Sequence, residues 1–179
     1  MSRIGKQPIE IPSGVEVKVG AQAIEVKGPK GNLSTPAHPA VEINVDGGKV
    51  HVLRKDETRL AREQHGLRRT LLANTITGVT KGFEKSLEIV GVGYKVQVQG
   101  KKVVLSVGYS HPVEFKLPEG IEAKAEGNKL TIVGINKELV GEIAARIRRV
   151  RPPEPFKGKG IKYSDEHIRR KAGKSGGKK

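Results

Sequence analysis

The sequence contains no cysteine and no tryptophan, and only 3% of its 179 residues are aromatic. The absence of cysteine excludes disulfides, thiolate metal ligands and cysteine nucleophiles, and it fits a cytoplasmic protein. Because aromatic side chains are so few, the interior has to be built from Val, Ile, Leu and Ala, so we expect small cores. The sequence also lacks a long apolar run, which argues against a secretory signal peptide and against a membrane-spanning helix.

Acidic residues are scarce relative to basic ones: 19 Asp and Glu face 34 Lys and Arg, a formal net charge of +15. Such a surplus repels itself unless a polyanion neutralises it, so the partner is expected to be a nucleic acid or an anionic membrane. Membrane binding would call for a basic amphipathic helix with large apolar anchors, and the chain has three Phe and no Trp. We therefore expect a nucleic-acid partner and no membrane.

The basic surplus is concentrated near the C-terminus. Residues 1–82 hold 13 basic and 8 acidic residues, residues 83–145 hold 8 of each, and residues 146–179 hold 13 and 3. The last 34 residues therefore carry +10 of the net charge of +15. This segregation indicates a dedicated binding element at the end of the chain.

An internal repeat indicates two related domains. Residues 12–33 align without gaps on residues 118–139, with six identities in 22 positions, and both segments begin with a Pro-x-Gly motif, at Pro12 and Pro118. Two unrelated amphipathic hairpins can look alike, but the shared proline, glycines and apolar phase favour a duplication.

Alternating apolar residues predict strands in both halves of the chain. The alternation is clear in residues 15–19 and 121–125. We also predict hairpins over residues 41–53 and 94–107, because two alternating runs flank a glycine-containing turn in each.

Two segments have the period of a helix instead. The first runs from about Glu57 to Thr75, after Asp56 as N-cap, and the second follows Asn136 as N-cap and ends near Val150. The expected apolar stripe of the first helix is Leu60, Leu67 and Leu71. The expected buried face of the second is Leu139, Val140, Ile143, Ala144, Ile147 and Val150.

These elements predict an α+β fold with two tandem, duplicated domains, each a mostly antiparallel sheet with one helix packed on one face, and a basic C-terminal tail. We place the first domain at residues 1–82, the second at 83–152 and a Gly/Lys-rich C-terminal extension at 153–179. The start of the extension follows from three prolines in residues 152–155, which end the second helix and stiffen the chain.

The extension contains the segment Phe156-Lys157-Gly158-Lys159-Gly160-Ile161-Lys162-Tyr163, in which basic residues alternate with glycines between two aromatics. In an extended chain, Lys157 and Lys159 project the same way, about 7 Å apart, and reach successive phosphates. The glycines would let the backbone approach RNA and donate N–H groups to it, and Phe156 and Tyr163 could stack on unpaired bases. This segment therefore predicts an RNA-binding element.

The alternative for the extension is a disordered, solubilising tail, in which a proline-rich lead, two aromatics and Ile161 would serve no purpose. Residues 169–179 have none of these features, and we expect them to be mobile until RNA orders them. The arginines at the end of the second helix allow two interpretations, contact with RNA or stabilisation of the helix dipole. The arginines of the first helix could likewise form an ordinary solvated face of that helix.

The sequence contains no constellation of catalytic residues. Its five histidines are isolated and lack metal-ligand spacing. Gly173-Lys174-Ser175 is similar to the end of a phosphate-binding loop, but Ile168 occupies the place of the first glycine. Gly91-Val92-Gly93 is more typical of a bulge or turn than of a nucleotide site. We expect neither an enzyme nor a metal, cofactor or small-molecule substrate.

Two motifs, Met1-Ser2-Arg3-Ile4-Gly5-Lys6-Gln7-Pro8-Ile9 and Pro153-Glu154-Pro155 with the segment 156–163, resemble the bacterial form of the large-subunit ribosomal protein six family. The likeness extends over essentially the whole chain. In the second motif Phe156 stands where that family leads us to expect tyrosine, which removes a hydroxyl but keeps a flat ring for stacking.

The resemblance implies two duplicated α+β domains in a structural constituent of the large ribosomal subunit, located in the cytoplasm. It implies binding to 23S-type rRNA near the base of the lateral stalk and the sarcin–ricin region, where the protein holds rRNA helices in place for translation beside neighbouring ribosomal proteins.

We predict a set of rRNA-binding residues at the end of the second helix and in the extension. They are Arg148, Arg149, Arg151, Phe156, Lys157, Gly158, Lys159, Gly160, Lys162, Tyr163, Arg169, Arg170 and Lys171. Two alternatives share the charge pattern: an architectural DNA-binding protein, which more often dimerises or inserts an apolar wedge, and an enzyme acting on RNA.

Overall fold

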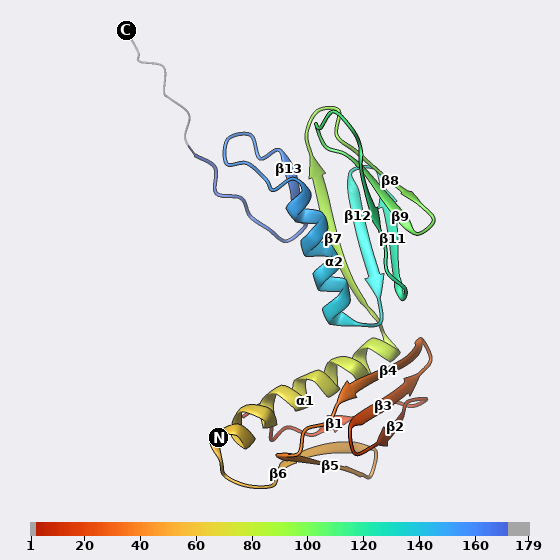
Figure 1. Ribbon diagram of the computed structural model, residues 1–179, viewed down its shortest axis with the longest axis vertical. Coiled ribbons are helices and arrows are strands. Elements are labelled where there is room, and N and C mark those ends of the chain that lie inside the picture. Colours follow the sequence, from red (N-terminus) through yellow and green to blue (C-terminus); the bar gives the residue numbers. More distant parts are fainter. Residues whose placement is uncertain (1–2, 172–179) are drawn as a thin grey trace. The chain divides into compact units, whose positions relative to one another are not determined.

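The computed structural model describes residues 3–171, which form two compact units (Figure 1). The first unit contains the chain up to Phe83 together with Ile135–Lys137, and the second contains Glu84–Gly134 and the chain from Glu138 onward. Helices and mostly antiparallel sheets confirm the predicted α+β class. The boundaries at residues 82 and 152 stay predictions.

The first unit contains two three-stranded sheets, ordered β1-β6-β5 and β2-β3-β4. Their strands are β1 (Ile9–Glu10), β2 (Glu16–Val19), β3 (Ala23–Gly28), β4 (Gly31–Pro36), β5 (Val41–Asp46) and β6 (Lys49–Arg54). The antiparallel pair β5 and β6 forms the predicted hairpin. Its turn consists of Gly47 and Gly48 at φ +53° and +78°, the left-handed region that a tight hairpin turn of this kind requires.

Helix α1 (Arg59–Thr80) packs against strands of both sheets. The core that they share consists of Ile9, Ile24, Val26, Val50, Leu72, Ile76 and Val79. Gly28 sets the close approach of helix and sheet, because a Cβ at this position would lie 2.6 Å from a methyl group of Val79. The first unit is thus an aliphatic core under one helix, as its composition predicts.

Two details predicted for α1 are wrong. Its N-cap is Thr58, whose hydroxyl accepts the N–H of Ala61, while Asp56 accepts both the N–H and the hydroxyl of Thr58. The expected apolar stripe is also displaced, since Leu60 and Leu67 are 51% and 47% exposed. The helix continues to Thr80, beyond the predicted end, and its buried face extends into that last part. The buried residues are Ala61, His65, Leu72, Thr75, Ile76, Gly78 and Val79.

The second unit also contains two sheets, ordered β10-β9-β8 and β11-β12-β7-β13. Their strands are β7 (Phe83–Val90), β8 (Lys95–Gln99), β9 (Lys102–Ser106), β10 (Val113–Lys116), β11 (Ile121–Glu126), β12 (Lys129–Gly134) and β13 (Gly160–Tyr163). β8 and β9 form the second predicted hairpin. β13 comes from the predicted C-terminal extension, so part of that extension belongs to a sheet.

Helix α2 (Lys137–Val150) begins directly after Asn136, where the sequence predicts its start. Val140, Ile143, Ala144 and Ile147 are buried, and Leu139 and Val150 are half-buried. The predicted phase of this helix is therefore confirmed, with the centre of the apolar face more deeply buried than its ends.

The internal repeat corresponds to two hairpins of the same kind, β2–β3 in the first unit and β11–β12 in the second. Gly14 and Gly120 of the repeated Pro-x-Gly motif have φ of +83° and +79°. The equivalence ends after the hairpins, because Leu33 lies in β4 whereas the aligned Leu139 lies in α2. The duplicated hairpin thus leads into a different element in each unit.

Candidate nucleic-acid interface

After α2 the chain turns around the carboxylate of Glu154. This carboxylate accepts hydrogen bonds from the backbone N–H groups of Phe156, Lys157 and Lys159 at 2.7, 2.8 and 3.0 Å. These hydrogen bonds hold the pKa of Glu154 below its ordinary value. The bond from Lys159 has the largest effect, and those from Phe156 and Lys157 have smaller ones. We call residues 154–159 the Glu154 loop.

The Glu154 loop contradicts the expectation that Lys157 and Lys159 lie in an extended chain. Residues 155–157 form a turn, and Gly158 has a φ of +75°. Successive N–H groups of a strand point in opposite directions, so three of them can converge on one carboxylate only when the chain curls. The N–H groups of residues 156, 157 and 159 therefore bind Glu154, where we expected them to be available to RNA.

Gly160 allows the next part of the chain to pass against the prolines. A Cβ on Gly160 would lie 2.6 Å from the carbonyl oxygen of Pro152 and 2.7 Å from the Cα of Pro153. The N–H of Ile161 donates to the carbonyl of Arg151 at 2.7 Å. Gly160 thus serves a close contact within the protein.

β13 pairs antiparallel with β7, with Ile161 opposite Ile89. Ile161 is fully buried and Ile89 is 1% exposed, which makes this strand part of the core of the second unit. Lys162 follows directly and pairs with Glu88 at 2.6 Å. Part of the predicted RNA-binding segment therefore stabilises the fold.

Arg148 is also engaged within the second unit. Its guanidinium binds both oxygens of the Glu166 carboxylate, one of them at 2.8 Å. This pair lowers the pKa of Glu166 and raises that of Arg148. Arg148 and Lys85 lie over the ring of Tyr163, 5.6 and 5.0 Å from its centroid, so the ring predicted to stack on bases already contacts two cations. We call Arg148 and Lys162 the inner cations.

Of the remaining predicted cations, Arg151 is half-buried and the other six are on the surface. Within residues 3–171 these six form no ion pair, and each side chain is exposed. We call this set the outer cations; it consists of Arg149, Lys157, Lys159, Arg169, Arg170 and Lys171. The N–H of Lys171 donates to the carbonyl of Pro155 at 2.9 Å, which brings the end of the described chain back to the Glu154 loop. Residues 172–179, the rest of the predicted extension, lie outside the described residues.

A concave site lies beside the Glu154 loop. We call it the aromatic pocket; it is lined by Tyr94, Tyr109, Arg151, Pro152, Glu154, Phe156, Lys157 and Lys159. The guanidinium of Arg151 lies 5.1 Å from the ring centroid of Tyr109, whose hydroxyl donates to the carbonyl of Val150 at 2.7 Å. Four of the predicted residues thus meet two tyrosines that sequence analysis missed.

Glycines around Tyr94 are the signal that could have found this residue. A Cβ on Gly91 would lie 2.6 Å from the ring of Tyr94, and one on Gly108 would lie 3.0 Å from it. The predicted turn at Gly91-Val92-Gly93 is confirmed, since the N–H of Tyr94 donates to the carbonyl of Gly91 at 3.2 Å. These glycines make room for an aromatic ring.

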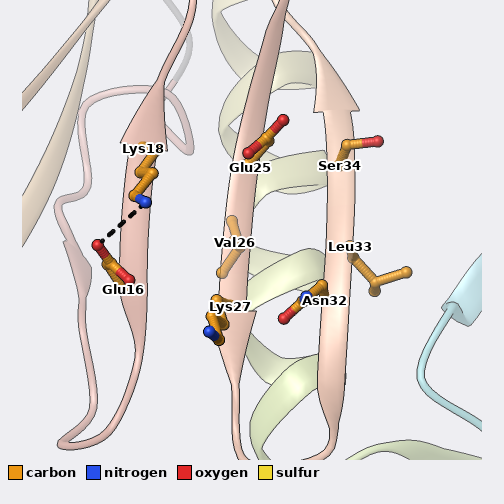
Figure 2. Close-up of a pocket in the computed structure, with 8 residues that line it drawn as sticks. All are labelled: Glu16, Lys18, Glu25, Val26, Lys27, Asn32, Leu33 and Ser34. Carbon is orange, nitrogen blue, oxygen red and sulfur yellow. Dashed lines mark ion pairs between the residues drawn. The ribbon is translucent and has the colours of Figure 1, made fainter.

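Another pocket lies on the sheet β2-β3-β4 of the first unit and has a different character (Figure 2). It is lined by Glu16, Lys18, Glu25, Val26, Lys27, Asn32, Leu33 and Ser34. Figure 2 shows Glu16 and Lys18 facing one another on β2, and their charged groups are 3.5 Å apart. Two carboxylates balance two amines in this pocket, so it has no surplus charge for a polyanion.

The described part of the chain has neither a membrane-spanning helix nor a metal-binding cluster. Its helices are too short or too polar to cross a membrane. Within the same residues, no three His, Asp or Glu side chains are grouped to hold a metal ion. His65, the buried histidine of α1, has its Nε2 2.8 Å from the carbonyl oxygen of Val52.

Comparison with known proteins agrees with this two-part organisation. The family model for ribosomal protein L6 matches residues 11–82 and 90–164. The chain belongs to the ribosomal protein L6 family. The two matched segments contain the two copies of the repeat, so the duplication predicted from residues 12–33 and 118–139 is a property of the family's fold.

Full-length relatives support the L6 assignment. The chain is 70% identical over 179 residues to the large ribosomal subunit protein uL6 of Solidesulfovibrio magneticus and 71% identical to that of Nitratidesulfovibrio vulgaris, with complete coverage of both chains. It is 62% identical to uL6 of Lawsonia intracellularis, over 99% of this chain and 98% of the relative. As a member of the L6 family, the chain is a structural ribosomal protein and not an enzyme, as predicted.

Proposed function

We propose that the chain is a structural constituent of the large ribosomal subunit in the bacterial cytoplasm, associated with rRNA and with other ribosomal proteins. In finer detail, it binds 23S-type rRNA near the base of the lateral stalk and the sarcin–ricin region and holds rRNA helices in place there. Family membership and the uL6 relatives support the subunit. The location on the rRNA rests on the family resemblance.

The observation that supports rRNA binding by the second unit is the outer set of cations around the Glu154 loop. Six exposed Lys and Arg side chains are held on one folded region, and the three that follow β13 return to this loop through the bond from Lys171 to Pro155. Lys and Arg side chains that neutralise phosphates release counterions, which makes binding strong and salt-dependent. The thirteen predicted site residues stay proposed as the rRNA-binding region, with the outer cations as the direct phosphate ligands and the inner cations stabilising the fold that presents them.

The experiment that tests this function compares binding of the purified chain to deproteinised large-subunit rRNA and to duplex DNA over a range of salt concentrations. We expect tighter binding to rRNA and a steep decrease with salt. Equal affinity for both would favour the architectural DNA-binding alternative. Sedimentation with the large subunit, lost at high salt, is the matching measurement in cell extracts.

The location on the rRNA has a test of its own. Chemical probing of large-subunit rRNA with and without the chain should show protection at the sarcin–ricin region and the base of the lateral stalk. Protection confined to other regions would contradict the proposed location and leave rRNA binding intact.

A further inference from the structure

The aromatic pocket of the second unit combines flat rings with positive charge. Tyr109 is 49% exposed and Phe156 is 66% exposed, and both line the pocket with Tyr94. An exposed aromatic side chain costs free energy in water, since about 25 cal/mol is lost for each Å² of apolar surface left uncovered. These two exposed rings and the half-buried Tyr94 around one concavity offer surfaces on which a planar group can stack.

The charges of the pocket are those that a nucleotide requires. Its lining carries three cations, Arg151, Lys157 and Lys159, against the carboxylate of Glu154. That carboxylate is already occupied by three backbone N–H groups. A phosphate at the rim would therefore meet two exposed amines, while a base would meet rings and a guanidinium.

The two tyrosine rings and the guanidinium are held in position before any ligand is present. The hydroxyl of Tyr109 is fixed by the carbonyl of Val150, and Arg151 lies over the Tyr109 ring. Tyr94 packs against Gly91 and Gly108, where a side chain would collide with its ring or come within 3.0 Å of it. Flat groups held in this way can stack on a base without first losing rotamer freedom.

We infer that the aromatic pocket captures one unpaired nucleobase of the bound RNA, stacked against Phe156 and the tyrosines, with the adjacent phosphates on Lys157 and Lys159. This inference rests on the proposed function. It adds that the group recognised by the pocket is an unpaired base. Outer cations alone need only the phosphate backbone, so they would bind paired and unpaired RNA alike.

Ultraviolet cross-linking of the full chain to deproteinised large-subunit rRNA tests the inference, with the cross-linked peptides identified by mass spectrometry. We expect nucleotide adducts on Tyr94, Tyr109 or Phe156. Adducts confined to residues outside the pocket would overturn it. If the chain does not bind this rRNA at all, the proposed function fails, and the inference fails with it.

Substitutions at Phe156 give an independent measurement. Phe156→Leu keeps an apolar side chain without a flat ring, and we expect about tenfold weaker rRNA binding, while Phe156→Tyr keeps wild-type affinity. Leu67→Ala, at a similarly exposed apolar residue of the first unit, is the control and should bind as the wild type does. Circular dichroism confirms folding of each variant. Equal affinity of Phe156→Leu and wild type, or equal losses in both Phe156 variants, would exclude stacking at this ring and leave salt-dependent rRNA binding standing.

Discussion

The inner and outer cations of the second unit come from the same short stretch of sequence and do different work. Lys162 and Arg148 bind Glu88 and Glu166 and stabilise the fold. Lys157 and Lys159 lie a few residues before Lys162. Within the described chain they form no ion pair with a carboxylate, and their side chains are exposed. The amino-acid composition does not distinguish these four cations, because it counts charges and does not show which of them are paired. Acidic residues elsewhere in the sequence decide which cations are already paired within the protein.

The largest expected effect comes from β13, the strand that carries the inner cation Lys162. Ile161→Ala removes a fully buried side chain from the sheet and should lower the free energy of unfolding by about 2–5 kcal/mol. Urea denaturation followed by circular dichroism measures it. Val92→Ala, at a residue that is 93% exposed in the same unit, is the control and should change the free energy by less than about 0.5 kcal/mol. Equal effects would mean that β13 is not part of the core.

The outer cations should affect binding and leave stability unchanged. Replacing both Lys157 and Lys159 by Ala is expected to weaken rRNA binding about tenfold and to reduce the slope of log K against log salt by about 2, roughly one per lost phosphate contact. Lys162→Ala, which removes an inner cation, should leave the slope unchanged. Filter binding at several salt concentrations measures both. A loss of slope in Lys162→Ala as large as in the double variant would abolish the distinction between inner and outer cations.

The ion pair between Arg148 and Glu166 predicts a pH dependence. Arg148 lowers the pKa of Glu166 in the folded state, so the carboxylate stabilises the fold at neutral pH, and that contribution is lost as the pH falls through the lowered pKa. Glu166→Gln should therefore be less stable than wild type at pH 7, and the difference should shrink in acid, below the ordinary glutamate pKa. Urea midpoints of both proteins from neutral to acidic pH measure this. A difference that stays constant with pH would show that the charge of Glu166 is not responsible.

The smallest expected effect belongs to an exposed pair on α2. Arg146 binds Glu142 one helical turn away, and both side chains are about half exposed. Arg146→Ala should lower the free energy of unfolding by only about 0.3–0.5 kcal/mol, because water and salt screen exposed pairs. The same denaturation experiment checks it. A loss as large as that from Ile161→Ala would mean that surface pairs contribute far more here than their exposure allows.

The parts of the fold that sequence analysis predicted correctly depend on neighbouring residues. The turn at Gly47 and Gly48 and the buried face of α2 follow from local spacing and backbone preference. The buried face of α1 was predicted wrongly because the leucines at positions 60 and 67 suggested a stripe that the sheets do not cover. Which face of a helix is buried depends on its partners, and here Gly28 brings β3 against Val79.

Sequence patterns predicted several residues of the candidate site, but they did not predict how these residues are arranged in space. Phe156, Lys157 and Lys159 stood out in the sequence, whereas Tyr94 and Tyr109 lie in another part of the chain and meet them only in the folded unit. The pairing of β13 with β7 is equally long-range, since it joins Ile161 to Ile89. No local pattern encodes such contacts, because they depend on how distant segments share one core.

The carboxylate of Glu154 is an anion within the Glu154 loop, and it binds the loop's own backbone N–H groups. Ordering a residue's backbone costs about 1–2 kcal/mol, a cost that a disordered tail would meet at the moment of binding. Here three N–H groups are already gathered on a negative oxygen pair, so residues 156–159 are shaped during folding of the protein. Association with RNA then has fewer degrees of freedom to remove, which favours a tight complex from a small number of contacts.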